Sequence, residues 1–286
     1  MLLLASSRPC STDPIMATTY DSASIRSPAL YELRELWRYR DLLRLLVSNS
    51  IKTRYKRSAL GVIWTLLNPL LTTIVLSIAF AQLFRFQIEN YTIYLLVGLI
   101  FWGFFSQSTT QAMSTLIWGS SLIKRIYIPR TIFAISVLGN ALVNFLLTMI
   151  PLAVIMLFTR HPFTLALLWL PLAILLFTMF TLGLSLLLST LAVYFVDVVD
   201  LYGILMTVWF YLTPVIYPLE IVPDQFAAWV ALNPMTFMLD LFRSIIYTGE
   251  SPALQTWGIA AGLAVVTLGL GWLFFTRRAN DFAYRI

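Results

Sequence analysis

The chain has 286 residues, of which 59% are apolar and only 11% are charged, and its mean hydropathy is +0.84. Soluble domains average roughly 45–50% apolar and about 25% charged residues, so this chain lacks the charges that a polar shell requires. The composition excludes a soluble globular fold. It predicts an all-α integral membrane protein, because a helix satisfies its own backbone hydrogen bonds in lipid.

Residues 1–27 precede the first helical pattern and contain Ser, Thr and Pro. We expect a disordered leader here, with Met16 as an alternative start. The single cysteine of the chain, Cys10, lies in this segment, so no intrachain disulfide can form. We assign no function to the leader.

An amphipathic helix is expected in residues 28–60. Leu33, Leu36 and Trp37 fall with further leucines broadly on one side of the helical pattern, and arginines flank that stripe. The pattern is typical of a helix that lies in the cytoplasmic interface of a membrane. A soluble helix that packs on a partner protein is the alternative.

Residues 61–286 are expected to form a transmembrane domain with six spanning helices. The candidate spans are charge-poor runs at about residues 62–83, 91–118, 132–158, 165–193, 198–217 and 257–275, since roughly 20 helical residues cross a bilayer. Pro69 and Pro151 are expected to bend the first and third spans. The second half of the second span is polar, so it is expected to face protein or water.

Positive charge is concentrated on one side of this topology. Sixteen of the 19 Lys and Arg residues lie in the N-terminal segment, the loop at 121–130 and the tail at 277–286. The opposite side carries only Arg85, Arg160 and Arg243. Because Lys and Arg are retained in cytoplasmic loops, both termini are expected in the cytoplasm. A basic patch for nucleic acid is the alternative, but retention explains the charges more simply, so no nucleic acid partner is expected.

Residues 218–250, between the fifth and sixth spans, do not fit a crossing helix. They carry five charges and several prolines, and no apolar run in them reaches 18 residues. Two short helices broken near Asn233 and Pro234 fit this pattern better. Broken helices at membrane depth are tolerated against protein or a water-lined cavity, so the segment is expected to be re-entrant on the outer side.

Catalytic and metal-binding patterns are not found. The chain has no GxxxxGK[ST] phosphate loop, so it is not expected to hydrolyse ATP alone, and no Cys/His spacing indicates a metal site. His161, the only histidine, is interpreted as a turn residue. Asp197 and Asp200 are interpreted as the first turn of the fifth helix, with an acid–base pair as the alternative. No span carries an acid at its middle, which argues against proton-driven transport.

Three stretches of the sequence share their order and spacing with one known family. They are residues 54–64 continuing to Asn68, Pro69 and Leu70, residues 122–130, and Asp197 through 213–218 (TPVIYP) to Asn233, Pro234, Met235 and Arg243. Together they resemble the membrane permease of type-2 ABC exporters, in the branch that exports polysaccharides and polyol-phosphate polymers. The resemblance covers about residues 30–286, and each motif alone is weak.

The resemblance implies a function and a set of partners. The expected substrate is a lipid-linked polysaccharide such as an O-antigen, capsule or teichoic acid chain, moved outward across a bacterial inner membrane. The expected assembly is a permease homodimer with two copies of a separate ATPase subunit, and ATP and Mg²⁺ would bind in that partner. No cofactor is expected in this chain.

The resemblance also implies roles for particular residues. The interface helix would include Arg54, Tyr55, Lys56 and Arg57. The loop at 119–130 would couple to the ATPase through Leu122, Ile123, Lys124, Arg125, Ile126, Tyr127, Ile128 and Arg130. Such a loop offers apolar anchors for a groove and cations that set the register, although a basic loop with no partner is the alternative. Residues 218–250 would form the external gate.

A path for polysaccharide needs surfaces that hold sugars weakly. Aromatic rings stack on the apolar faces of sugars, and hydroxyl and amide groups exchange hydrogen bonds with them. The candidates are Trp64, Asn68, Phe101, Trp102, Phe105, Gln107, Trp209, Tyr211 and Tyr217. The chain holds 20 Phe, 13 Tyr and 9 Trp, so many of these rings are expected to serve packing or interface belts.

The sequence leaves three other functions open. An ABC permease for a small drug or lipid would share the fold. An intramembrane enzyme acting on a lipid-linked sugar would need convergent carboxylates or a metal site, which the sequence does not offer. A passive channel is the third alternative.

Overall fold

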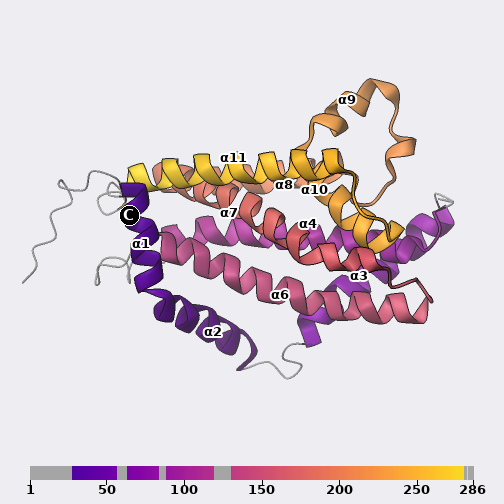
Figure 1. The fold of residues 1–286 in the computed structure, drawn as a ribbon, viewed down its shortest axis with the longest axis horizontal. Coiled ribbons are helices and arrows are strands. Elements are labelled where there is room, and N and C mark those ends of the chain that lie inside the picture. Colours follow the sequence, from indigo (N-terminus) through magenta and orange to yellow (C-terminus); the bar gives the residue numbers. More distant parts are fainter. Residues whose placement is uncertain (1–27, 57–62, 84–87, 119–129, 280–281, 283–286) are drawn as a thin grey trace, which may run out of the picture.

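The computed structural model describes residues 28–56, 63–83, 88–118, 130–279 and 282. Within these ranges the chain is helical and contains no strand. Figure 1 shows most of the long helices running along a common axis, with α1 across one end and α9 on an arch at the other. We call these the α1 end and the α9 end. The predicted leader, residues 1–27, lies outside the described residues.

Two helices occupy the segment where one amphipathic helix was predicted. α1 spans Pro28–Arg38 and α2 spans Arg40–Lys56. They meet at Tyr39, where hydrogen bonds continue from Tyr39 N to Glu35 O (2.9 Å) and from Leu43 N to Tyr39 O (3.0 Å). The bend lets α1 pack across α6 and α11 while α2 lies along α6. Trp37 on α1 is 74% exposed.

Four helical stretches of the described chain are long and apolar enough to cross a membrane. They are α4 (Tyr91–Trp118), α6 (Thr131–Phe158), the continuous turn and helix η2–α7 (Leu165–Trp169 and Leu170–Tyr194) and α11 (Leu254–Arg278). Shorter apolar stretches lie in α3 (Ile63–Leu83) and α8 (Val198–Leu212).

α8 is shorter than the span predicted from the sequence. The predicted run continued to residue 217, but the helix ends at Leu212 and Thr213 adopts an extended conformation with ψ of 133°. Pro214 follows, and a residue before proline is driven out of the helical region by the proline ring. At the other end of α8, Asp197 is the N-cap residue and Asp200 lies in the first turn, which agrees with the helix-start interpretation of these acids.

The core of the bundle is aromatic and centres on α4. The rings of Phe101 and Phe177 stack with centroids 4.0 Å apart, and Phe242 packs against both at 5.5 and 5.6 Å. These side chains join α4, α7 and α10. Buried aromatic pairs of this kind fill a core and add directional contacts, so they fix the middle of α4 against α7 and α10.

α7 and α11 approach each other most closely at two glycines. A Cβ atom on Gly183 would collide with the backbone of Thr267, and one on Gly271 would collide with the carbonyl of Gly183. Small residues at such crossings allow two backbones to touch in a membrane. The pair therefore fixes the position of α11 on the bundle.

Short helices occupy the segment between α8 and α11. They are η3 (Leu219–Ile221), α9 (Asp224–Leu232), α10 (Pro234–Arg243) and a π-helical turn, η4 (Ser244–Thr248). The break at Asn233 matches the position expected from the sequence. Its side chain accepts a hydrogen bond from Met235 N at 3.0 Å, and Pro234 opens α10, a combination that starts a helix. The arch around α9 stands away from the bundle (Figure 1) and exposes Trp229 and Leu232.

Candidate functional site

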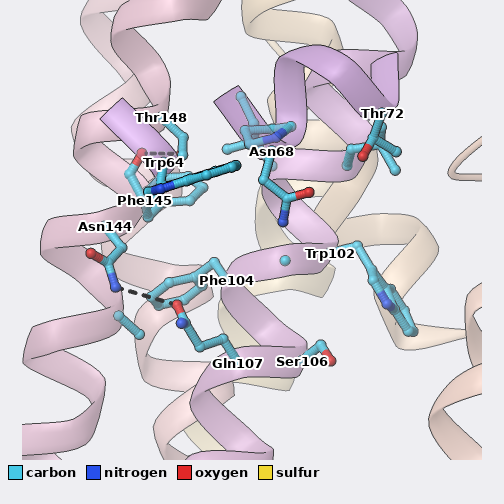
Figure 2. Close-up of a pocket in the computed structure, with 15 residues that line it drawn as sticks. Trp64, Asn68, Thr72, Trp102, Phe104, Ser106, Gln107, Asn144, Phe145 and Thr148 are labelled. Carbon is cyan, nitrogen blue, oxygen red and sulfur yellow. Dashed lines mark hydrogen bonds between the residues drawn. The ribbon is translucent and has the colours of Figure 1, made fainter. Parts of the chain in front are cut away.

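A cavity of about 570 Å³ opens among α3, α4 and α6. Its walls come from the N-terminal half of α3 and the middle of α4 and α6 (Figure 2). The lining residues are Trp64, Asn68, Pro69, Thr72, Leu99, Ile100, Trp102, Gly103, Phe104, Ser106, Gln107, Ala141, Asn144, Phe145 and Thr148. Its size is within the range of small-molecule sites, roughly 300–1,000 Å³.

The cavity carries several polar side chains on a mainly apolar wall, and it is uncharged. Asn68, Gln107 and Asn144 bring one amide each from three different helices toward the same space, as Figure 2 shows. Asn144 Nδ2 donates to Gln107 Oε1 at 3.5 Å, a long hydrogen bond. The hydroxyls of Thr72, Ser106 and Thr148 and the indoles of Trp64 and Trp102 also line the cavity, and apolar residues form the rest of its wall. None of the described lining residues carries a charge at neutral pH.

The sequence explains how these polar groups come together. The polar second half of α4 begins at Ser106 and Gln107, and α6 carries Asn140, Asn144 and Thr148 at four-residue intervals. Four residues is close to one helical turn, so such positions share a face. The α4 and α6 polar faces meet at the cavity, while apolar residues of the same helices form the core.

Four of the nine side chains predicted for a substrate path line the cavity: Trp64, Asn68, Trp102 and Gln107. Phe101 and Phe105 do not. They are 1% and 0% exposed, and they pack against Phe177 and Phe180 of α7 in the aromatic core. Residues four apart lie on one side of a helix, and that side of α4 faces α7. In this structure the two phenylalanines are packing residues.

The remaining three candidates lie on α8 and just beyond it. Trp209 Nε1 donates to Asn233 Oδ1 at 2.9 Å, and its ring meets the edge of Trp102 with centroids 6.4 Å apart. Trp209 thus connects the cavity wall to the α9 end. Tyr211 is 64% exposed, and Tyr217 OH donates to the Tyr211 carbonyl at 2.7 Å, so both lie apart from the cavity.

Asn144 and Thr148 are cavity residues that were not among the predicted path residues. The four-residue spacing of Asn140 and Asn144 was visible in the sequence. What the spacing alone did not reveal is which neighbour this face meets. The structure supplies that information, because α6 packs on both α3 and α4.

The predicted interface and coupling residues are only partly described. Arg54, Tyr55 and Lys56 fall within the last turn of α2, and Lys56 is exposed. Arg57 and the coupling residues Leu122, Ile123, Lys124, Arg125, Ile126, Tyr127 and Ile128 lie outside the described residues. Arg130 is described and stands directly before α6, with its guanidinium carbon 5.7 Å from the centre of the Phe282 ring.

A carboxylate of α1 joins this end of the bundle. Thr131 Oγ1, on the first residue of α6, donates to Glu32 Oε2 at 2.6 Å. Burial raises the pKa of the Glu32 carboxyl above its usual value, although the hydrogen bond from Thr131 and the charge of Arg130 lower it. α1 is therefore tied to the residue that follows the predicted coupling loop.

His161 lies near the α9 end, in the turn after α6. Its Nε2 is 3.1 Å from the Ile246 carbonyl oxygen, and its ring stacks on Tyr247 with centroids 6.1 Å apart. Among the described residues no group of three His, Cys, Asp or Glu side chains is arranged to hold a metal. The histidine thus joins two segments of the α9 end.

Membrane-length helices and an uncharged cavity with convergent amides are features of a membrane protein that handles a polar, neutral ligand. The chain matches the ABC-2 type transporter family over residues 41–247. It therefore belongs to that family, and it is the membrane permease of a transporter rather than an enzyme.

Its relatives narrow the class further. The chain is 33% identical over 258 residues to the O-antigen export system permease protein RfbA of Myxococcus xanthus, which covers 89% of this chain and 98% of the relative. It is 32% identical over 212 residues to the O-antigen export system permease protein RfbA of Klebsiella pneumoniae, covering 73% of this chain and 81% of that protein. The resemblance found in the sequence motifs is confirmed at the level of the family.

Proposed function

We propose that this chain is the membrane subunit of an ATP-driven exporter that moves a lipid-linked polysaccharide of the O-antigen kind outward across the bacterial inner membrane. The observation that carries the proposal is the cavity among α3, α4 and α6, in which three amides and two indoles surround an uncharged space. The names of the relatives support the same substrate class.

The chemistry of the lining suits a neutral sugar. An amide both donates and accepts hydrogen bonds, as the hydroxyls of a sugar require. An indole face packs on the apolar face of a sugar ring, and Trp64 is 56% exposed and so can be reached by a ligand. The lining offers no charge that would hold a sugar tightly, which suits a chain that must slide.

The membrane topology is part of the proposal. α3 and α8 would cross the bilayer with the four longer helices, so both termini would lie at the α1 end. Sixteen of the 19 Lys and Arg residues belong by sequence to the N-terminal segment, the loop at 121–130 and the tail at 277–286, and this distribution supports a cytoplasmic α1 end. The re-entrant helices α9 and α10 would then lie on the outer side.

The assembly would contain two permeases and two ATPase subunits. α3 and α8 expose large apolar side chains such as Val75 and Ile204, which a second copy or lipid would cover. ATP and Mg²⁺ would bind in the ATPase partner. The loop at 119–130 would dock on that partner through its isoleucines and cations, and α1 and α2 would lie in the cytoplasmic interface.

The test is transport by the reconstituted complex. Permease and ATPase subunit are placed in vesicles with a lipid-linked polysaccharide, and ATP-dependent movement of the polymer is measured. Trp64→Ala and Trp102→Ala should each slow export about two- to tenfold, because one aromatic contact is worth about 0.5–1.5 kcal/mol, and both should leave assembly intact. ATP-dependent flux of a small amphiphile without the polymer would favour a drug or lipid permease, and conversion of the lipid-linked sugar without ATP would favour an enzyme.

A further inference from the structure

Three consecutive backbone carbonyls after α8 are each held by a side chain from another helix. Arg243 Nη2, at the end of α10, donates to Val215 O at 2.8 Å. Tyr91 OH donates to Ile216 O at 2.9 Å, and Tyr94 OH donates to Tyr217 O at 3.0 Å. The two tyrosines are one turn apart at the start of α4. Residues 215–217 of the segment 213–217, which belongs to the third sequence motif, are thus each held by a hydrogen bond to the backbone carbonyl.

Arg243 is the centre of this arrangement. Its side chain is 8% exposed, and its guanidinium carbon lies 3.6 Å from the centre of the Tyr94 ring, a close cation–π contact. Its Nε is buried without a hydrogen-bond partner, and the carboxylate of Asp240, three residues earlier on α10, acts on its charge without forming a close ion pair. A buried cation with an unmet donor holds its site less firmly than a fully paired one, so this contact is suited to release.

The fit of the segment on α4 depends on Gly98. A Cβ atom at this position would lie 2.8 Å from Val215 O, 3.1 Å from Val215 Cγ1 and 3.3 Å from Arg243 Nη2. Any larger residue would therefore act as a wedge between α4 and the segment.

The start of the same segment is tied to the re-entrant helices. Asn233 Nδ2 donates to Thr213 Oγ1 at 2.9 Å, and Asn233 Oδ1 accepts from Trp209 Nε1. Trp209 in turn touches Trp102 of the cavity wall. Movement of the segment 213–217 would therefore alter contacts at both α10 and the cavity wall.

We propose that Arg243 is a positioning residue for the exit of the path: together with Tyr91 and Tyr94 it clamps the segment 213–217 onto α4, and each export cycle releases this clamp. The inference rests on the proposed function, in which the α9 end is the outer end. It gives the Thr213–Tyr217 motif and Arg243 one shared task, which is to close the bundle between turnovers.

The test uses a cysteine reporter on the clamped segment. Ile216 is 9% exposed, so an Ile216→Cys substitution in a Cys10→Ser background should react slowly with a membrane-impermeant maleimide applied from the α9 side. In the complex with its ATPase subunit, ATP hydrolysis should speed labelling severalfold. An equal labelling rate with and without ATP hydrolysis would overturn the proposal, because a purely structural contact does not open during turnover.

Variants identify the residues that hold the clamp. Arg243→Ala should label about tenfold faster at rest. The double change Tyr91→Phe and Tyr94→Phe keeps both rings and removes only the donating hydroxyls, so it should fold normally and label several times faster. Gly98→Ala should do the same, whereas Gly258→Ala, whose added methyl meets open space on α11, should label like the parent. Slow labelling in the Tyr→Phe double variant and in Gly98→Ala would also contradict the clamp.

Polymer export by the unmodified complex is measured beside the labelling and separates the two proposals. If the complex moves no lipid-linked polymer but labelling still rises with ATP hydrolysis, the proposed substrate is wrong and the clamp is supported. If the polymer moves while labelling stays constant, the proposed function stands and the clamp is wrong.

Discussion

At the residue scale, the cavity and the α1 end use polar groups in different ways. The amides of Asn68, Gln107 and Asn144 face an open space that a ligand can enter. The carboxylate of Glu32 is instead closed against Thr131 and Arg130. In the proposed function the first arrangement would bind substrate, whereas the second holds helices together, so substitutions at the two sites should affect different measurements.

Asn144 tests the cavity. Asn144→Leu keeps the size of the side chain and removes an amide that can bind a sugar hydroxyl, a loss of about 1 kcal/mol or about fivefold in apparent affinity. Stimulation of ATP hydrolysis by a lipid-linked polysaccharide should need correspondingly more polymer. Ser136→Ala on the same helix is the control, because its hydroxyl binds back to the Phe133 carbonyl at 2.8 Å and lies outside the cavity. Equal half-saturation for the two variants would remove Asn144 from the binding surface.

Glu32 tests the α1 end through pH. Its carboxyl has a pKa raised by burial, so the folded protein binds this proton more tightly than the unfolded chain does. Its contribution to stability is therefore present at acidic pH and is lost as pH rises through the folded pKa. Glu32→Gln keeps an acceptor for Thr131 and carries no charge. The unfolding temperature of this variant minus that of the parent should increase between pH 4 and pH 7, and a constant difference would show that desolvation of Glu32 does not matter.

At the element scale, helix positions were predictable from apolar runs, but helix ends and faces were less so. The second predicted span, at about residues 91–118, corresponds to α4, because a long charge-free stretch satisfies its backbone hydrogen bonds in lipid only as a helix. α8 stopped at Leu212 because Pro214 outweighs the apolar residues that follow. No proline or glycine near Tyr39 indicated the bend between α1 and α2. The bend depends on how these two helices pack on the bundle.

It was harder to predict which side of α4 meets which neighbour than to do so for α6. α4 is the most buried of the four long helices, and a helix that is covered on most sides has no broad lipid face to mark its orientation. Phe101 and Gln107 were therefore equally good candidates for a path. Contacts with α7 decide between them, and these contacts join residues far apart in the sequence.

The crossing of α7 and α11 is tested by two glycines of α11. Gly271→Ala places a methyl group against the Gly183 carbonyl and should destabilise the fold by about 1–3 kcal/mol, the usual range for overpacking. Gly269→Ala, two residues earlier, meets nothing within 4 Å and should be neutral or slightly stabilising, because alanine favours helix over glycine by up to about 1 kcal/mol. Thermal unfolding of the two purified variants in detergent measures the difference, and equal unfolding temperatures would mean that the close approach is not required.

At the scale of the whole molecule, the bundle has two chemically different ends. The α1 end carries buried acid, exposed Trp37 and the arginines of α1 and α2, while the α9 end carries the aromatic and backbone contacts around Arg243. Net positive charge at one end favours one orientation in a membrane, and at the other end α10 packs into the core through Phe242 while the arch around α9 stands away from the bundle.

The proposed orientation, with the α1 end in the cytoplasm, can be measured in cells. Trp37→Cys on α1 and Trp229→Cys on α9 replace side chains that are 74% and 67% exposed, so neither change should disturb the core. In a Cys10→Ser background, an impermeant thiol reagent should label the cysteine at 229 in intact cells whose outer membrane is permeable to it. The cysteine at 37 should react only after the inner membrane is opened. Labelling of position 37 from outside would contradict the proposed orientation. It would also place the polar half of α4, which lines the cavity, toward the outer side, and a polymer made in the cytoplasm would then not meet that half of α4 on entry.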